Sequence, residues 1–85
     1  MNNHPTIKLY GADRCHKTQF YINFLNETGL QYEFLDVEIS EDHANELRGL
    51  YENKKLNFPT ITIGSKKLRN PHTEDLKKWL SKLIP

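Results

Sequence analysis

The chain has 85 residues, of which 36% are hydrophobic and 27% are charged, a composition typical of one small globular domain rather than a disordered segment. Its twelve Lys and Arg residues nearly balance eleven Asp and Glu residues, so charge provides no argument for a nucleic acid or a membrane as partner. No stretch is long and apolar enough to span a membrane, and residues 1–5 are predicted to be a polar tail rather than a signal peptide. We therefore treat residues 1–85 as one domain. Because a lone cysteine suits a reducing environment, we expect it in the cytoplasm.

The first half of the chain alternates between strand and helix patterns. Residues 6–10 alternate apolar and polar side chains and predict a strand. Residues 15–28 predict a helix that Gly29 ends in the left-handed conformation. Residues 32–37 predict a second strand, whose more continuous apolar character indicates a central position or cover on both faces. Strand, helix and strand within about 30 residues predict a parallel βαβ unit with a right-handed crossover.

The second half begins with a helix and then changes pattern. This helix begins at Ser40 or Asp42, either of which can cap it, and ends near Asn53. Residues 60–63 and 66–68 predict two short strands, joined by a two-residue loop that starts with glycine, which is a hairpin signal. The predicted order is β-α-β-α-β-β-α, an α/β domain with a mixed four-stranded sheet flanked by three helices. The last helix is defined by a cap and an apolar face with helical spacing: Thr73, then Leu76, Trp79, Leu80 and Leu83.

The cysteine of the chain, Cys15, lies where the first predicted strand gives way to the first predicted helix. The unpaired N–H groups and the positive dipole end of a helix N-terminus favour a thiolate there. Arg14, Lys17 and a protonated His16 would act in the same direction. The position three residues on is Thr18, so no disulfide can form within this motif. From the residues alone, Cys15 is either a nucleophile or a partly buried structural residue.

Two turns accompany the cysteine. Pro59 directly precedes a predicted strand, where proline is tolerated and where a cis peptide bond would turn the backbone N–H and C=O of Phe58 outward, free to pair with an extended peptide-like ligand. Thr73 follows a turn that contains Pro71, and the N–H groups at the start of its helix can bind a carboxylate. The four histidines show no metal-ligand spacing with the cysteine, so the sequence predicts no metal site.

In their order and spacing, these motifs resemble the glutaredoxin family of the thioredoxin fold, over roughly residues 6–83. The C-x-x-T tetrad that starts at Cys15 is similar to the family's redox motif. Phe58-Pro59-Thr60 is similar to its cis-proline signature, and residues 61–64 with the following strand are similar to its terminal hairpin. The resemblance implies a thioredoxin/glutaredoxin fold and a glutathione-dependent thiol–disulfide oxidoreductase. It also implies a monomer whose partners are glutathione and glutathionylated or disulfide-containing proteins.

The resemblance assigns roles to individual residues. Cys15 would attack a mixed disulfide between a protein and glutathione and become glutathionylated, and a second glutathione would restore the thiolate. This monothiol cycle needs no second cysteine. Phe58, through its backbone beside Pro59, would hold the cysteinyl portion of glutathione, and Lys17 or Arg14 would attract its glycine carboxylate.

Departures from the family pattern leave two alternatives open. One is a catalytically inactive binding or regulatory module of the thioredoxin fold. The other is an arsenate-reductase-like or stress-regulator-like relative, although Phe58-Pro59 stands where such proteins carry Arg-Pro. His16 and Lys17, the two residues between Cys15 and Thr18, do not match the iron–sulfur-carrying members of the glutaredoxin family, so no bound cluster is expected. The departures are Thr18 in place of a second cysteine, His16 and Lys17 inside the motif, and Arg69-Asn70-Pro71 in place of a glycine pair.

Overall fold

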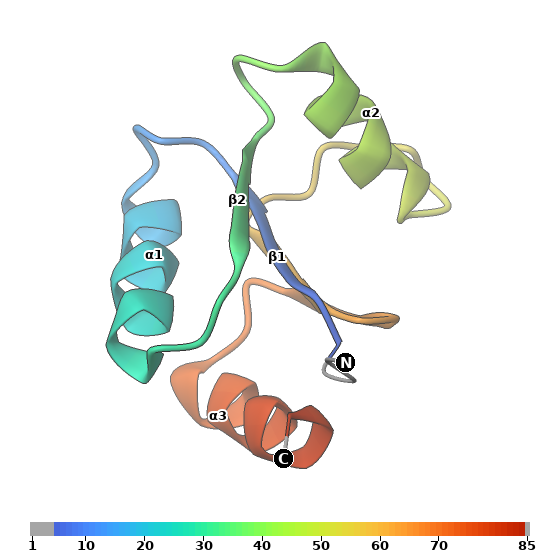
Figure 1. Cartoon of the computed structure of the whole chain (residues 1–85). Helices are drawn as coiled ribbons and strands as arrows, with labels where there is room; N and C mark the ends of the chain where they lie inside the picture. The colour runs from blue at the N-terminus through green and yellow to red at the C-terminus, as the bar shows by residue number, and fades with distance from the viewer. Residues whose placement is uncertain (1–4, 85) are drawn as a thin grey trace.

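The computed structural model describes residues 5–84, so the predicted tail, residues 1–5, lies outside this range except for Pro5. The element order β-α-β-α-β-β-α is confirmed (Figure 1). No helix within the described range has the length and apolar character needed to cross a membrane. The elements are β1 (Ile7–Gly11), α1 (His16–Thr28), β2 (Glu33–Asp36), α2 (Glu41–Gly49), β3 (Thr60–Ile63), β4 (Lys66–Arg69) and α3 (Thr73–Leu83).

The four strands form a mixed sheet in the order β2-β1-β3-β4. β1 pairs in parallel with β2 and antiparallel with β3, and β3 pairs antiparallel with β4. Thr60, at the start of β3, lies opposite Tyr10 of β1 and Arg69 of β4. The carboxyl end of β1, the beginning of β3 and the end of β4 therefore meet at one end of the sheet.

Helices cover both faces of the sheet, with α1 and α3 on one face and α2 on the other (Figure 1). Successive side chains of a strand point to opposite faces, so each strand contributes to two apolar cores. The first core, under α1 and α3, contains Ile7, Leu9, Tyr21, Leu25, Ile61, Ile63, Leu76 and Leu80. The second core, under α2, contains Tyr10, Leu35, Val37, Ala44 and Leu47.

The end of α2 differs from the prediction, and of the two alternatives predicted for β2 only cover on both faces holds. α2 ends at Gly49 rather than near Asn53, because the chain closes tight turns after the helix and reaches a left-handed φ of 57° at Lys54. β2 lies at the edge of the sheet and not at its centre. Its predicted cover on both faces is confirmed, since Phe34 packs against the first core and Leu35 belongs to the second. A strand with apolar residues on both faces is therefore covered on both faces, but it can still have only one neighbouring strand.

Gly11, the last residue of β1, passes directly over the side chain of Thr18 in α1. A Cβ atom at position 11 would lie 2.7 Å from Thr18 Cγ2 and closer still to Thr18 Oγ1. Thr18 has 0% exposure, and its Oγ1 accepts a hydrogen bond from the Ala12 N–H at 3.2 Å. These contacts fix the position of α1 relative to the end of β1.

Replacing Gly11 should therefore destabilise the fold. Gly11→Ala is expected to lower the free energy of unfolding by about 1–3 kcal/mol, because the added methyl group overpacks a buried contact. Urea denaturation measures the effect. Gly49→Ala is the matched control: a Cβ there meets no atom within 4 Å, and its free energy of unfolding should stay equal or rise. A Gly11→Ala variant as stable as the parent would contradict the packing described here.

Candidate functional site

Cys15 occupies the N-cap position of α1, where it is partly buried. Its backbone is extended, with φ −83° and ψ 124°. The Cys15 N–H donates to Ala12 O at 2.9 Å, and the Cys15 C=O accepts from the Gln19 N–H at 3.0 Å. These two bonds tie the residue to the turn before the helix and to the first helical turn, so its sulfur lies at the helix N-terminus.

The groups around the sulfur favour its ionised form. The backbone N–H of Thr18 has the largest effect, the Thr18 hydroxyl and the Lys17 N–H act in the same direction, and the Lys17 ammonium adds a coulombic attraction, although the Cys15 side chain forms no cap hydrogen bond. Together they hold the pKa of the Cys15 thiol below its usual value, although burial acts in the opposite direction. The Thr18 oxygen accepts from the Ala12 N–H, which leaves the proton of its hydroxyl free to face the thiolate. His16 is exposed on the same turn.

The loop that carries Cys15 is held by two residues that the sequence did not single out. The Asp36 carboxylate, at the end of β2, accepts from the Asp13 N–H at 3.3 Å and from the Glu38 N–H at 2.8 Å. Gln19 Nε2 donates to Asp13 O at 2.6 Å. An Asp that ends a strand before a turn commonly bonds to the backbone two residues on, so this local pattern was the available signal for Asp36.

Arg14 and Lys17 differ in what surrounds their charges. The Arg14 guanidinium forms a two-pronged pair with Glu38, with Nε–Oε1 at 2.9 Å and the second N–O distance at 2.7 Å. This pair joins the β1–α1 loop to the β2–α2 loop. Lys17 is exposed and makes no ion pair with any carboxylate of residues 5–84. Lys17 is therefore the cation beside Cys15 whose charge is not already matched by a described residue.

Pro59 lies at the same end of the sheet as Cys15. The register pairs Tyr10 with Thr60, so one residue further along it places Pro59 beside Gly11. The Phe58–Pro59 peptide bond is cis. The side chain of Phe58 packs against the second core. Within residues 5–84, its backbone N–H and C=O have no hydrogen-bond partner, and they are available to a ligand.

The turn before α3 is attached to this end of the sheet. The Asn70 N–H donates to Pro59 O at 2.9 Å, and the Tyr21 hydroxyl of α1 donates to Pro71 O. His72 is the N-cap of α3 because its backbone is still extended, and its side chain makes no cap bond. The cap predicted at Thr73 is thus displaced by one residue, and Thr73 is the first residue of the helix. The structure brings the three motifs found in the sequence to one end of the sheet.

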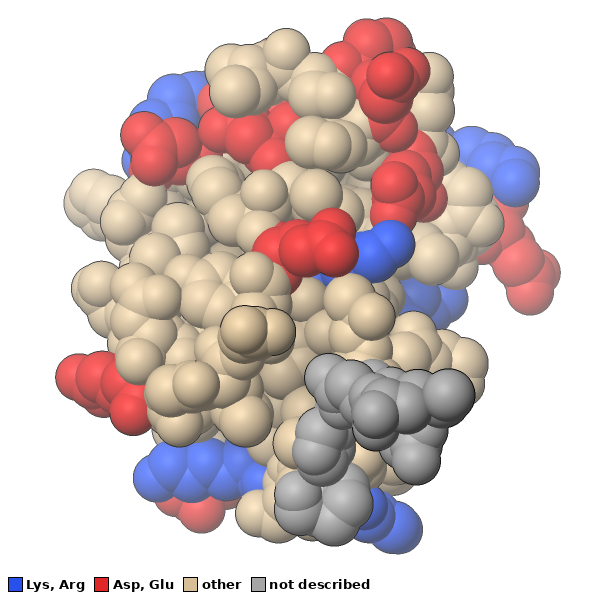
Figure 2. Space-filling model, viewed as in Figure 1, with Lys and Arg blue, Asp and Glu red and all other residues tan. Residues whose placement is uncertain are grey.

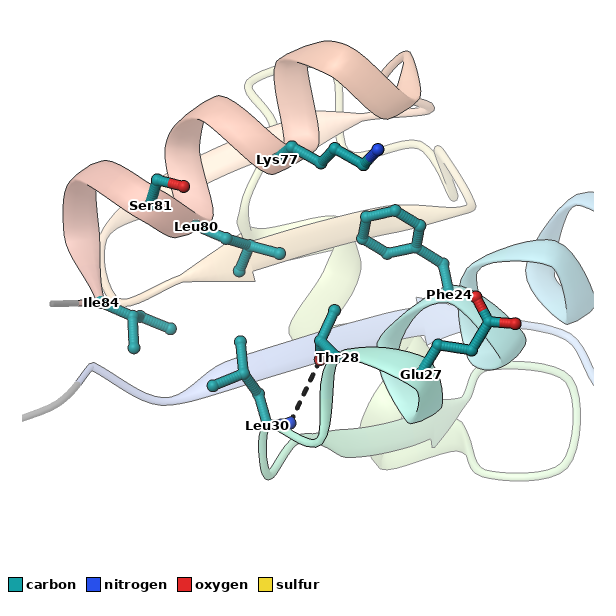
Figure 3. A pocket seen from close by; sticks show the side chains of 8 residues that line it. All are labelled: Phe24, Glu27, Thr28, Leu30, Lys77, Leu80, Ser81 and Ile84. Carbon is teal, nitrogen blue, oxygen red and sulfur yellow. Dashed lines mark hydrogen bonds between the residues drawn. The ribbon is translucent and has the colours of Figure 1, made fainter.

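Two hollows of the surface lie away from the thiol. One, on the α2 side of the sheet, has a volume of about 340 Å³ and is bordered by Tyr10 and Glu46, which hydrogen-bond to each other. The other, of about 500 Å³, separates the end of α1 from α3 (Figure 3). Cys15 borders neither of these two hollows. No group of three metal-ligating side chains occurs within residues 5–84. The larger hollow is lined by Phe24, Glu27, Thr28, Leu30, Lys77, Leu80, Ser81 and Ile84.

Comparison with known proteins finds matches among solved structures. No protein-family model matches the sequence, and no curated protein matches it. The thioredoxin-like protein BC3987 shares 25% identity and a TM-score of 0.73, covering 86% of this chain and 97% of that one. A mutant form of it gives a TM-score of 0.75 at 25% identity, with 88% and 99% covered. The glutaredoxin from Archaeoglobus fulgidus shares 18% identity and a TM-score of 0.73, with 87% and 84% covered.

The element order, the sheet and these neighbours define the class of protein. The chain has the thioredoxin fold and is a thiol-oxidoreductase-like module. It shares this fold with thioredoxin-like and glutaredoxin structures.

Thr18→Val should make Cys15 harder to ionise. Valine keeps the shape of threonine and removes the hydroxyl, so the pH midpoint of Cys15 alkylation by iodoacetamide is expected to rise. Thr18→Ser keeps the hydroxyl and should keep the midpoint. The Thr18→Val variant also leaves the buried Ala12 N–H without its partner, which is expected to lower the free energy of unfolding by about 1–3 kcal/mol. A midpoint unchanged in Thr18→Val would show that the hydroxyl does not stabilise the thiolate.

Proposed function

We propose that this protein is a monothiol oxidoreductase that acts on mixed disulfides between proteins and glutathione. The observation that carries the proposal is the position of the sole cysteine. Cys15 lies at the N-terminus of α1, where the amides of Lys17 and Thr18 lower the pKa of its thiol, and the buried Thr18 fills the place of a second thiol. The thiolate is the nucleophile of thiol–disulfide exchange, and no internal disulfide is available. The exchange therefore needs a separate thiol to complete it.

The proposed cycle has two exchanges. The Cys15 thiolate attacks the glutathionyl sulfur of the mixed disulfide; a Cys15–glutathione disulfide forms, and the protein thiolate leaves and takes a proton from water. The thiolate of a second glutathione then attacks the glutathionyl sulfur on Cys15. This step releases oxidised glutathione and restores the Cys15 thiolate. Overall, one protein–glutathione mixed disulfide and one reduced glutathione give one protein thiol and one oxidised glutathione.

The residues around Cys15 support glutathione as the co-substrate. The Phe58 N–H and C=O, which have no partner among the described residues, can pair with the cysteinyl backbone of glutathione. The amides at the start of α3, near Thr73, suit one of its carboxylates. The Lys17 ammonium can bind the other carboxylate of glutathione. Arg14 is less suited to this contact, because its guanidinium is already bound by Glu38. A reducing cytoplasm is the compartment that supplies glutathione to such a cycle.

The first test follows the glutathionylation of Cys15 by oxidised glutathione across pH, using intact mass. The lowered pKa of Cys15 makes the thiolate abundant at lower pH, so the rate should rise with a midpoint clearly below the unperturbed value of about 8.5. Reduced glutathione should remove the adduct, and Cys15→Ser should form none. Slow reaction with a midpoint near the unperturbed value would contradict the proposal. That result would favour the alternative of a binding module that has kept the fold without turnover.

A second test separates Lys17 from Arg14. Lys17→Gln is expected to raise the KM for glutathione roughly two- to fivefold, the usual size of one exposed charge pair. Arg14→Gln should raise it less, because Glu38 already compensates that charge. The assay is run well above the alkylation midpoint of each variant, so that every form is fully thiolate and the Lys17 effect on ionisation does not contribute. Equal effects of the two substitutions would assign the carboxylate contact to neither residue.

A further inference from the structure

Three lysines surround the single tryptophan of the chain. The ammonium nitrogens of Lys66, Lys82 and Lys78 lie 4.0, 5.2 and 5.8 Å from the centre of the Trp79 ring. Lys66 comes from β4 and the other two come from α3, so tertiary structure brings the three charges together. We call Lys66, Lys78, Lys82 and Trp79 the lysine–tryptophan patch. The ring attracts each cation, but the three ammonium groups repel one another.

The patch belongs to a half of the molecule with a strong excess of positive charge. Residues 54–85 contain eight of the twelve Lys and Arg residues and only two of the eleven Asp and Glu residues. Figure 2 shows most of the acidic side chains of this face over its upper part, around α2, and basic side chains at the lower margin, where α3 lies, beside fewer acidic ones. Within residues 5–84, every ion pair is made by Lys8, Arg14 or Arg48. No described carboxylate forms an ion pair with a lysine of the patch, although Glu74 and Asp75 precede Lys78 by four and three residues on α3.

Helix electrostatics explain only part of this arrangement. A lysine in the last turn suits the negative end of a helix dipole, and Lys82 lies there. Lys78 and Lys82 are four residues apart on α3, a spacing at which like charges destabilise a helix. Lys66 has no connection with the helix dipole, yet its ammonium lies nearest the ring. The arrangement is therefore better suited to an external anion than to the stability of α3.

The separation of the basic patch from the acidic first half of the chain indicates which kind of anion can bind. A long polyanion such as nucleic acid, or an extended anionic membrane, would also meet the carboxylates of the first half of the chain. A short acidic segment can contact the patch without reaching them. The Trp79 ring is covered by Lys66, so it does not offer an open face for base stacking. We propose that the lysine–tryptophan patch is a docking surface for a short acidic segment of a partner protein.

This surface is separate from the thiol site. Lys66 pairs with Ile63, and Ile63 pairs with Ile7 at the start of β1, whereas Cys15 follows the end of β1. The patch therefore lies at the opposite end of the sheet from Cys15. The proposal does not depend on the redox activity of Cys15, and a Cys15→Ser protein serves equally well to test it.

The test measures the binding of an oligoglutamate peptide to the full-length Cys15→Ser protein, by fluorescence anisotropy of the labelled peptide. An oligoglutamine peptide of the same length is the uncharged control. Trp79 provides a second readout, since selective excitation of the only tryptophan reports events at the patch itself. We expect saturable binding of oligoglutamate with a parallel change in Trp79 emission, weakening as salt is raised.

Two matched double variants locate the site. Lys66→Gln with Lys82→Gln should weaken binding roughly tenfold, as expected for the loss of two exposed charge pairs that are each worth about threefold. Lys54→Gln with Lys55→Gln removes the same charge from exposed positions outside the patch and should change binding little. Circular dichroism checks that both variants unfold at the parent temperature. A variant that unfolds earlier is replaced by its single Lys66→Gln or Lys82→Gln form.

Three results would overturn the proposal. The first is no binding of oligoglutamate beyond that of oligoglutamine. The second is an equal loss in the two double variants, which would mean that only total charge matters. The third is tighter binding of oligothymidine or of phosphatidylserine vesicles through the same lysines, which would assign the patch to nucleic acid or to a membrane.

Discussion

The packing of Thr18 beneath the end of β1 is the contact on which the thiol site depends. Its side chain has no exposure and touches the one position of β1 where a Cβ would not fit. β1 and α1 therefore approach more closely than any residue other than glycine at position 11 would allow. Because of this close approach, the N-terminus of α1 lies next to the loop that follows β1. Cys15 is the N-cap residue of α1 and belongs to this loop. The thiol is activated by the packing of two elements, and nearby charges add to an effect already present.

The same residue explains how a single thiol can be useful without a resolving partner. The Thr18 oxygen accepts from the Ala12 N–H, and the same hydroxyl helps to lower the pKa of the Cys15 thiol, so one side chain serves the turn and the thiolate together. A cysteine at that position would be a weak donor and a weak acceptor, and would leave the Ala12 N–H poorly paired. With threonine at position 18, no disulfide can form with Cys15, but the Ala12 N–H has a stronger acceptor than a cysteine sulfur would provide. The site therefore favours the ionised form of the Cys15 thiol.

The parts of the structure that could be predicted from the sequence are those that local pattern determines. Gly29 ends α1 with a left-handed φ of 75°, and the Ser40 side chain accepts from the His43 N–H, both as glycine and serine at these positions suggest. The contacts of Arg14 and Asp13 could not be assigned in this way. Their partners lie 24 and 23 residues away, and the register of β2 against β1 decides which carboxylate reaches them.

The charge of the chain is organised by the same tertiary structure. The half that holds β1 to α2 contains most of the carboxylates and pairs three of its own cations with them, whereas the half that holds β3 to α3 leaves its cations unmatched by described residues. The near-neutral total conceals this division. Thiol exchange distinguishes disulfides mainly by the acidity and accessibility of their sulfurs, and so selects weakly among partner proteins. In a domain of this size, a charged surface at the far end of the sheet can choose a partner without altering the geometry that keeps Cys15 reactive.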